Sequence, residues 1–398
     1  MNPSVYALTF AAPIRITTNT GDSWYPSVAA VGNHVYVVWQ DWTPVSGSGT
    51  MPEIWLRVSS NYGASFGSAI RLTTNTGRSQ YPSVAASGSY VYVVWDDDTH
   101  VSGSGTASEI WLRVSSNYGA GFGSAIRLTT NAYVSRAPSV AAVGSNVYVA
   151  WMDNTPVTGS DGSYEIWLRV SSNNGASFGS PIRLTTNTGT SGEASVAAVG
   201  SNVYVAWDDN TPVSGSSGSY EVWLRVGSNN GASFSSPVRI SMNTGDSEYP
   251  SVAAVGNNVY VAWQDDTPVT GSGGSPFPEI WLRVSSNSGA LFGSAIRIST
   301  NTGASENPSV AAVGSNVYVA WMDNTPVSGS GASYEVWLRV SSNNAASFGS
   351  AIRLTTNTGG SWSPYVAVSG SYVYVAWMDN TPVTGSGSSY EIWFRVGS

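Results

Sequence analysis

The sequence of 398 residues has no cysteine and no lysine, and only 10 % of its residues are charged. Without cysteine the chain can form no disulfide bond and no thiolate metal site. All 16 basic residues are arginines, the formal charge is −8 and there is no basic cluster, which argues against a nucleic-acid partner. No apolar run approaches the length that spans a bilayer, and segment 1–10 lacks the basic and apolar parts of a signal peptide.

What the sequence does contain is an internal repeat. The motif EIWLRV, or a close variant, begins at seven glutamates: Glu53, Glu109, Glu165, Glu221, Glu279, Glu335 and Glu391. The spacing is 56 residues, except for 58 between the fourth and fifth copies, where two extra residues fall in the loop before Glu279. Each unit has four strand-like runs separated by turn residues, and in the first unit these are 27–32, 34–41, 53–59 and 69–74.

Four strands in each of seven units predict an all-β fold, a seven-bladed β-propeller with four antiparallel strands per blade. A solenoid is the alternative, disfavoured because neither end carries a polar capping repeat. The chain ends after a third strand, while segment 10–21 aligns with the fourth strand at 66–77. We therefore expect one propeller over 1–398, with 1–18 closing the seventh blade and the repeat units running from 19 onward.

The repeated strands also predict how the blades meet. In EIWLRV one face carries Ile54 and Leu56, and the other carries Glu53, Trp55 and Arg57. Because both faces of a blade touch neighbours, we expect the recurrent arginine and glutamate to pair in the seams between blades. Each unit also contains W-x-D-x-T, as in 39–43. Its aspartate is expected to cap the loop turn and pair with a seam arginine; a Ca²⁺ site shared with Glu53 is the alternative, and no other cofactor is expected.

The segment SSNYGASF at 59–66 matches the Asp-box pattern S-x-D-x-G-x-T-W, with Asn, Ser and Phe as replacements, and five similar copies follow. On these boxes and the flanking VYVVWQD…EIWLRVSSN, the chain resembles the BNR/Asp-box, sialidase-like propellers, and their uncharacterised exo-sialidase-like branch in particular. In that family the box is a structural turn. We expect Asn61 to form an Asx turn, Gly63 to supply an unusual φ and Phe66 to plug the blade edge.

The connection from each fourth strand to the next first strand repeats a frame, NTGDSWYPS at 19–27, whose central serine is constant while its neighbours vary. This connection leads into the innermost strand, so we expect it to rim the central channel. The only arginines outside the repeat pattern fall here, and the three extra tryptophans fall in loops of the same face. The candidate ligand-binding residues on this face are Asp22, Trp24, Tyr25, Trp42, Arg78, Gln80, Tyr81, Tyr133, Arg136, Glu193, Asp246, Glu248, Tyr249, Glu306 and Trp362.

Aromatic side chains with a few polar groups in a concavity suit a carbohydrate or another small ligand. Drift of loop positions under weak packing constraint is the alternative explanation. We also expect Trp24 and Trp362 to be neighbours, because their blades meet at ring closure.

The resemblance implies that a sialidase-like enzyme would need an arginine triad, a tyrosine activated by glutamate, and an acid/base aspartate. Only Arg78 and Arg136 are available outside the scaffold. Candidates for the other roles are Tyr81 or Tyr133, Glu193, Glu248 or Glu306, and Asp22 or Asp246, none of them in a recognisable motif. No GxSxG, HExxH or phosphate loop is present, so we assign no catalytic residue and disfavour catalysis.

The leading hypothesis is a non-enzymatic, extracellular or cell-surface propeller that binds glycan or protein ligands through the face of the 2–3 and 4–1 loops. Its basis is a repeated scaffold with diversified loops. The Lys-free, Ser/Thr/Gly-rich composition leaves a second hypothesis open, a structural protein that assembles into a surface layer or filament. A divergent sialidase-like glycoside hydrolase is the third.

Overall fold

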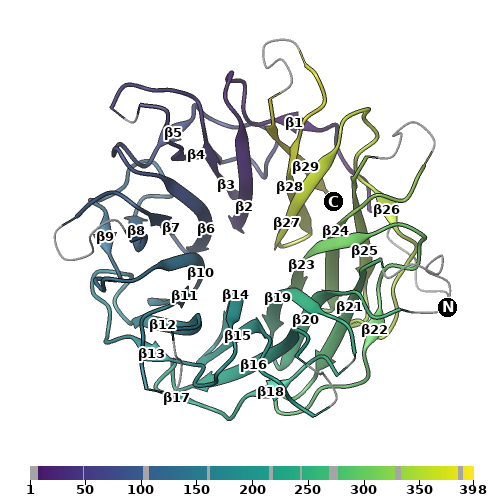
Figure 1. The fold of residues 1–398 in the computed structure, drawn as a ribbon. Coiled ribbons are helices and arrows are strands. Elements are labelled where there is room, and N and C mark those ends of the chain that lie inside the picture. Colours follow the sequence, from purple (N-terminus) through teal and green to yellow (C-terminus); the bar gives the residue numbers. More distant parts are fainter. Residues whose placement is uncertain are drawn as a thin grey trace.

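The computed structural model describes residues 8–47, 49–101, 107–158, 162–214, 218–242, 244–268, 277–327, 333–383 and 389–398. Within these ranges the chain forms a closed ring of seven β-sheets and no helix (Figure 1). The predicted all-β, seven-bladed propeller is thereby confirmed. Residues 1–7 of the expected closing segment, and most of the longer loop before the fifth EIWLRV motif, lie outside the described residues.

In every blade the strands run in antiparallel order from the ring centre outward. The first blade is β2 (Ser23–Val31), β3 (His34–Asp41), β4 (Glu53–Ser59) and β5 (Ile70–Arg71). The second, third and fourth blades are β6 (Ser79–Ser87), β7 (Tyr90–Asp97), β8 (Glu109–Ser115) and β9 (Ile126–Arg127); β10 (Ser135–Val143), β11 (Asn146–Asp153), β12 (Glu165–Ser171) and β13 (Ile182–Arg183); and β14 (Ser191–Val199), β15 (Asn202–Asp209), β16 (Glu221–Ser228) and β18 (Val238–Arg239), with β17 (Ser233–Phe234) also paired to β16. The fifth, sixth and seventh are β19 (Ser247–Val255), β20 (Asn258–Asp265), β21 (Glu279–Ser285) and β22 (Ile296–Arg297); β23 (Ser305–Val313), β24 (Asn316–Asp323), β25 (Glu335–Ser341) and β26 (Ile352–Arg353); and β27 (Ser361–Ser369), β28 (Tyr372–Asp379), β29 (Glu391–Gly397) and β1 (Ile14–Arg15).

The N-terminal strand closes the ring, as the sequence predicts. Strand β1 pairs with β29, with Ile14 opposite Phe394, and Phe10 forms a further bridge to Gly397. The seventh blade is thus built from both ends of the chain, which leaves no unpaired edge between the first and last blades.

Two strand lengths differ from expectation. Only two residues of the expected fourth strand 69–74 pair with β4, because the Thr73 hydroxyl takes the place of a backbone acceptor and receives the Ile54 N–H at 2.8 Å. The innermost strand, expected at 27–32, begins earlier, at Ser23, and carries a bulge between Trp24 and Ser27.

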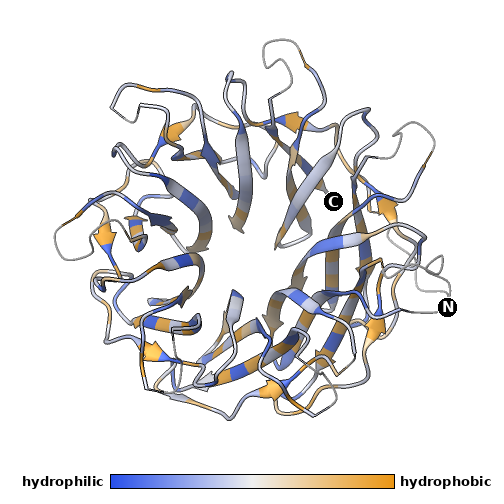
Figure 2. Cartoon of the chain, viewed as in Figure 1, coloured by the Kyte–Doolittle hydropathy of each residue, from blue (hydrophilic) through white to orange (hydrophobic). Residues whose placement is uncertain are grey.

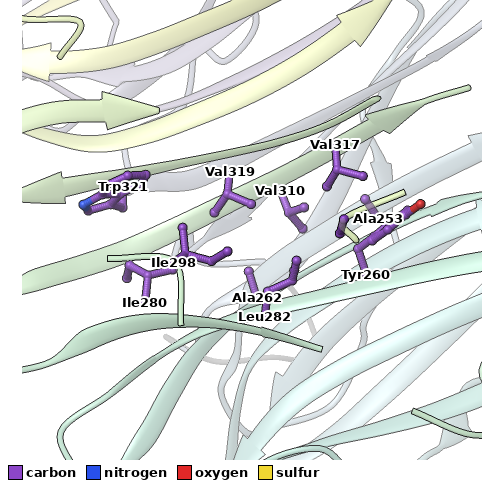
Figure 3. Packing of buried hydrophobic residues seen from close by; sticks show 11 residues of the cluster. Ala253, Tyr260, Ala262, Ile280, Leu282, Ile298, Val310, Val317, Val319 and Trp321 are labelled. Atoms are coloured by element: carbon purple, nitrogen blue, oxygen red, sulfur yellow. The ribbon is translucent and has the colours of Figure 1, made fainter. Parts of the chain in front are cut away.

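The seams between blades hold the core. In the seam between the fifth and sixth blades, Leu282 and Ile298 of one blade pack against Val319 and Trp321 of the next, all nearly inaccessible to water (Figure 3). Figure 2 shows the same pattern around the ring: hydrophobic positions lie on the strands, including the short outermost ones, and the outer loops are mostly neutral or hydrophilic. Truncating a core leucine to alanine costs about 2–5 kcal/mol, so each seam contributes strongly to stability.

The expected pairing of arginine with glutamate occurs, but with one of the two arginines only. Glu53 of the third strand binds Arg71 of the fourth strand of its own blade, with 2.8 Å between Oε1 and Nη2. The same ion pair recurs in all seven blades. The arginine of EIWLRV, such as Arg57, takes part in none of the ion pairs found within the described ranges. The recurrent glutamate therefore pairs with the fourth-strand arginine of its own blade, and not with the EIWLRV arginine that shares its strand face.

The aspartate of W-x-D-x-T joins two blades. Asp97 Oδ2 accepts hydrogen bonds from Trp95 Nε1 at 3.2 Å, Ser79 Oγ at 2.7 Å and Asn75 Nδ2 at 2.5 Å, and Oδ1 accepts from Thr99 N–H at 2.8 Å. The cap on the loop is confirmed, and the pairing with an arginine is not found in the described part of the chain. With its oxygens occupied by protein donors, this carboxylate is a poor start for a calcium site.

The same contacts explain the recurrent letters of NTG-x-S, in which Asn and Ser occur in all seven copies and Gly in six, with Tyr133 in the third. Asn75, in the connection from the first blade, and Ser79, at the start of β6, both donate hydrogen bonds to Asp97. Gly77 lies against the next loop so closely that a Cβ would stand 2.4 Å from the backbone nitrogen of Thr99. The frame therefore repeats because it locks each blade onto the next one.

The turns between the third and fourth strands lie at the other end of each blade. Asn61 Oδ1 accepts the Ser65 N–H at 3.0 Å, Gly63 has a φ of 81°, and the ring of Phe66 packs edge-on against Phe394 at 5.0 Å. The local contacts expected for this loop are therefore present.

Candidate functional site

Every innermost strand carries a bulge of two residues, and the first of the two has a left-handed backbone. The seven φ values lie between 44° and 52°, at Tyr25, Tyr81, Ala137, Glu193, Tyr249, Asn307 and Ser363. A bulge re-aims the side chains around it, and a non-glycine residue in this region costs roughly 1–2 kcal/mol. We call these seven positions, with the residue just before each, the inner rim. It coincides with the variable part of the sequence frame.

Side chains of the second strands support the inner rim. Gln40 Oε1 accepts the Tyr81 N–H at 3.0 Å, and Asp96 Oδ2 accepts the Ala137 N–H at 3.0 Å. Two further copies do the same: Asp208 to Tyr249 N–H at 3.1 Å, and Gln264 to Asn307 N–H at 3.0 Å. The three remaining blades have methionine at this position: Met152, Met322 and Met378.

These supporting residues are absent from the candidates chosen by sequence. The sequence did contain a sign of these supporting residues, because the middle residue of W-x-D changes between Gln, Asp and Met within an otherwise nearly constant strand. A position that varies while its neighbours stay fixed indicates a local requirement that differs from blade to blade. Here that requirement includes two buried carboxyl groups, of Asp96 and Asp208.

Aromatic rings form a continuous row over the seventh, first and second blades. Trp24 and Trp362 are linked through Tyr390, whose ring centroid lies 6.0 Å from the first and 5.3 Å from the second. Trp24 also packs against Trp42 at 5.8 Å. The row continues to the rim with Trp24 and Tyr25 at 6.5 Å, and Tyr25 and Tyr81 at 4.8 Å.

This row brings together five of the sequence candidates. The expected proximity of Trp24 and Trp362 exists, but through an intervening ring that sequence reasoning missed. A tyrosine before EIW or EVW occurs in four of the seven units. This uneven occurrence was the sign in the sequence that could have identified Tyr390.

Arg136 organises the next part of the inner rim. Burial lowers the pKa of Arg136, but a hydrogen bond with Tyr164 and the charges of Asp96 and Tyr81 outweigh burial and raise that pKa. Burial raises the pKa of Asp96 to about 7, although the backbone N–H of Ala137 and Arg136 act in the opposite direction. A carboxyl group with such a pKa can exchange a proton near neutrality.

A second cluster of acidic side chains belongs to the fourth and fifth blades. Burial raises the pKa of Asp208 well above its usual range, and the neighbouring Glu193 raises it further. Burial also raises the pKa of Glu193, while Arg136 lowers it. Burial, Glu193 and Glu248 raise the pKa of Tyr249 to about 12. Tyr25, on the first blade, adds to that rise, so rim residues from distant blades influence one another.

The remaining sequence candidates have other surroundings. Asp22 and Asp246 accept backbone N–H groups of Tyr390 and Tyr220, at 2.9 and 2.8 Å, and so hold the 2–3 loops. The Arg78 N–H donates to Asp98 Oδ1 at 2.5 Å, and the Arg78 carbonyl accepts the Asp98 N–H at 3.2 Å. The other candidates are placed as follows: Tyr133 is 43 % exposed, Gln80 pairs opposite Asp96, and Glu306 accepts the Tyr334 hydroxyl at 3.0 Å.

Tyr365 is a further residue of the ring centre that sequence reasoning missed. Six innermost strands have serine at this position, and Ser27 Oγ, for example, accepts the Val84 N–H of the next blade at 3.2 Å. In the seventh blade Tyr365 stands there instead, 37 % exposed and hydrogen-bonded to Ser27. One aromatic residue thus occupies a position that is serine in the other six blades.

Two features bear on partners in the described residues. No group of three or more His, Asp and Glu side chains that could hold a metal ion occurs within them. The same ranges contain no helix long and apolar enough to cross a membrane.

Comparison with protein-family models and with curated proteins gives no match to this sequence. Solved structures do match. The polysaccharide lyase Uly1 gives a TM-score of 0.60 at 7 % identity, over 97 % of this chain and 99 % of that one. Trypanosoma rangeli sialidase in complex with the inhibitor DANA gives 0.52 at 12 % identity, over 98 % and 60 %. The phage phi92 endosialidase gives 0.50 at 12 % identity, over 96 % and 68 %.

These matches show a sialidase-like β-propeller fold, as the resemblance in the sequence implied. The chain spans 60 % of the length of the T. rangeli enzyme. At identities of 12 % and below, a shared fold does not define a shared activity.

Proposed function

We propose that the protein is a non-enzymatic propeller that binds glycans at the inner rim. The observation that carries this proposal is the row of aromatic rings that ends at Tyr25 and Tyr81, beside the charged residues around Arg136. Apolar faces of a sugar ring stack on aromatic side chains, while guanidinium and carboxylate groups bind its hydroxyls. That a polysaccharide lyase and an endosialidase share this fold supports the choice of ligand.

A glycan array tests the proposal. The wild type should bind a defined set of glycans, and the double variant Trp24→Ala/Trp362→Ala should lose that binding. Because Trp24 also packs inside the protein, Tyr25→Ala provides a second variant whose side chain is 38 % exposed. Loss of one such aromatic contact at the centre of a site typically weakens binding by about 30-fold or more.

Tyr62→Ala is the matched control. Tyr62 is also an exposed tyrosine, at 45 %, with a left-handed φ of 59°, but it lies in a loop between the third and fourth strands. This control should bind like the wild type. A wild type that binds no glycan, or a Tyr25→Ala variant that binds as well as Tyr62→Ala, would refute glycan binding at the rim.

A divergent glycoside hydrolase is the second candidate, favoured by the carboxyl groups of Asp208 and Glu193. Two neighbouring carboxyl groups with raised pKa values resemble the arrangement in which one acts as a general acid. One observation argues against a sialidase-like hydrolase. Among the described residues of the inner rim, Arg136 is the one arginine whose side chain takes part in the interactions, whereas a sialidase-like site would use three arginines. Turnover of sialyl or other aryl glycosides that is lost in Glu193→Gln would favour this candidate over binding alone.

We place this binding outside the cell or at its surface. The support is the Lys-free composition, whose polar surface relies on Ser, Thr, Asn and Gly. Immunogold labelling of intact cells, with and without permeabilisation, tests it; labelling that requires permeabilisation would contradict it.

A further inference from the structure

Small cavities open in the seams between blades, away from the inner rim. Four seams have one: those between the first and second, second and third, third and fourth, and sixth and seventh blades, with volumes of about 190, 220, 340 and 200 Å³. Their linings are equivalent by the repeat. Each is formed by two tryptophans and the EIWLRV arginine of one blade, and by the Leu-Thr-Thr-Asn segment of the blade before it.

The cavity between the second and third blades shows the arrangement. Trp151 of β11 and Trp167 of β12 form its aromatic wall, with Arg169 beside them. Thr130 and Asn131, which follow β9, form the opposite side. The cavity is thus lined by indole rings, by threonine and asparagine side chains, and by an arginine.

Within the described ranges, Arg169 has no acidic partner. The fourth-strand arginine of the same blade, Arg183, pairs with Glu165 at 2.7 Å, but none of the ion pairs among the described residues involves Arg169. Its Nη1 donates to the Leu128 carbonyl at 2.8 Å, and its buried Nε has no partner. Burial lowers the pKa of Arg169, with no opposing charge. A half-buried cation that forms no ion pair favours an anionic ligand.

The other polar groups of the cavity also call for an acceptor. Trp167 Nε1 is buried and has no hydrogen-bond partner. The carboxylate in the lining, Asp153, already accepts from Asn131 at 2.7 Å, Ser135 at 2.7 Å and Trp151 at 3.2 Å. The cavity therefore offers donors without partners, while the Asp153 carboxylate is occupied by protein donors. A ligand that binds these free donors must supply the hydrogen-bond acceptor.

We propose that the seam cavities bind single sugar units that carry a carboxylate, with the carboxylate on the EIWLRV arginine and the ring against the tryptophans. Volumes of 190–340 Å³ lie near or below the lower end for ligand pockets, about 300 Å³, and so suit one ring rather than a chain. With four such seams on one ring, a polyanionic glycan can engage several weak sites at once and gain avidity. This site is separate from the inner rim and does not depend on the function proposed for it.

NMR of the arginine Nε–Hε groups tests the proposal on the intact chain, with methyl glucuronide as the probe. The signal that disappears in Arg169→Gln is thereby assigned to Arg169. In the wild type this signal should shift saturably with methyl glucuronide, and the signal of Arg183, already paired with Glu165, should not. Thr130→Trp, at an exposed position of the lining, should abolish the shift while leaving Arg169 in place.

Two control titrations define the overturning results. Methyl glucoside, which has the ring without the carboxylate, should not move the Arg169 signal, and acetate, which has the carboxylate without the ring, should move it more weakly than methyl glucuronide. No saturable shift with methyl glucuronide would overturn the proposal. So would an equal effect of methyl glucoside, which removes the role of charge, or an equal effect of acetate, which leaves a simple anion site.

Discussion

Replacing Asp96 by asparagine should stabilise the protein at neutral pH. Asp96 is 2 % exposed, and burial raises the pKa of its carboxyl group from 3.8 to about 7. Asparagine retains an oxygen that can accept the Ala137 N–H. The chain itself shows that an amide fits this role, because Gln40 and Gln264 accept the equivalent N–H groups in other blades.

The magnitude follows from the two protonation states. Between pH 4 and 7 the folded protein keeps a proton that the unfolded chain releases, so the free energy of unfolding falls as pH rises. One pKa unit corresponds to about 1.4 kcal/mol, so a pKa of about 7 in place of 3.8 costs the folded state on the order of 4 kcal/mol above pH 7. Below pH 4 the penalty disappears.

The assay is urea unfolding of wild type and Asp96→Asn at several values between pH 4 and 8. The difference in unfolding free energy between the two proteins isolates Asp96 from the other acidic groups, which both share. This difference should grow in favour of the variant as pH rises, and level off above pH 7. Gln40→Glu is the reciprocal control and should lose stability over a similar range. A difference that stays constant with pH would refute the reasoning, because Asp96 would then ionise alike in both states.

Further outcomes follow from the contacts between blades. Gly77→Ala should destabilise the protein by about 1–3 kcal/mol in thermal unfolding, because its Cβ would meet the Thr99 backbone at 2.4 Å. The control Gly121→Ala should change stability little, because its Cβ would have its nearest neighbour at 3.7 Å. Equal effects of the two substitutions would contradict the close approach of Gly77 to Thr99. Asp97→Ala should lower the free energy of unfolding by more than about 3 kcal/mol, because it leaves several buried donors without an acceptor. A decrease below about 1 kcal/mol in urea unfolding would show that Asp97 does not join the blades.

The fold could be predicted from the sequence because each blade repeats the same physical requirements. EIWLRV alternates between two seams, NTG-x-S binds the aspartate of the next W-x-D, and segment 10–21 supplies the missing strand. Errors occurred where side chains replace backbone pairing. Thr73 shortens the fourth strand, and no propensity argument reveals that a threonine hydroxyl will take a ladder position.

The candidate site was predictable in location but not in composition. The variable letters of the frame identified Trp24, Tyr25 and Arg136, because variation within an exact repeat is visible by inspection. Asp96 and Tyr390 were missed because they come from other strands and reach the rim only through the ring geometry. The left-handed φ at the bulge could not be predicted either, since tyrosine, alanine and glutamate all occupy it.

The strained bulges link the scaffold to the function proposed for the rim. If they served only to turn the chain, glycine or asparagine would hold the left-handed φ at lower cost, yet Tyr25, Tyr81 and Tyr249 stand there. The bulge re-aims the side chains at these positions. The repeat thus supplies a rigid frame that can hold a different side chain in each blade, and the energy that the seams provide offsets the local strain. Binding at the rim and stability of the seams are therefore expected to respond to separate sets of substitutions.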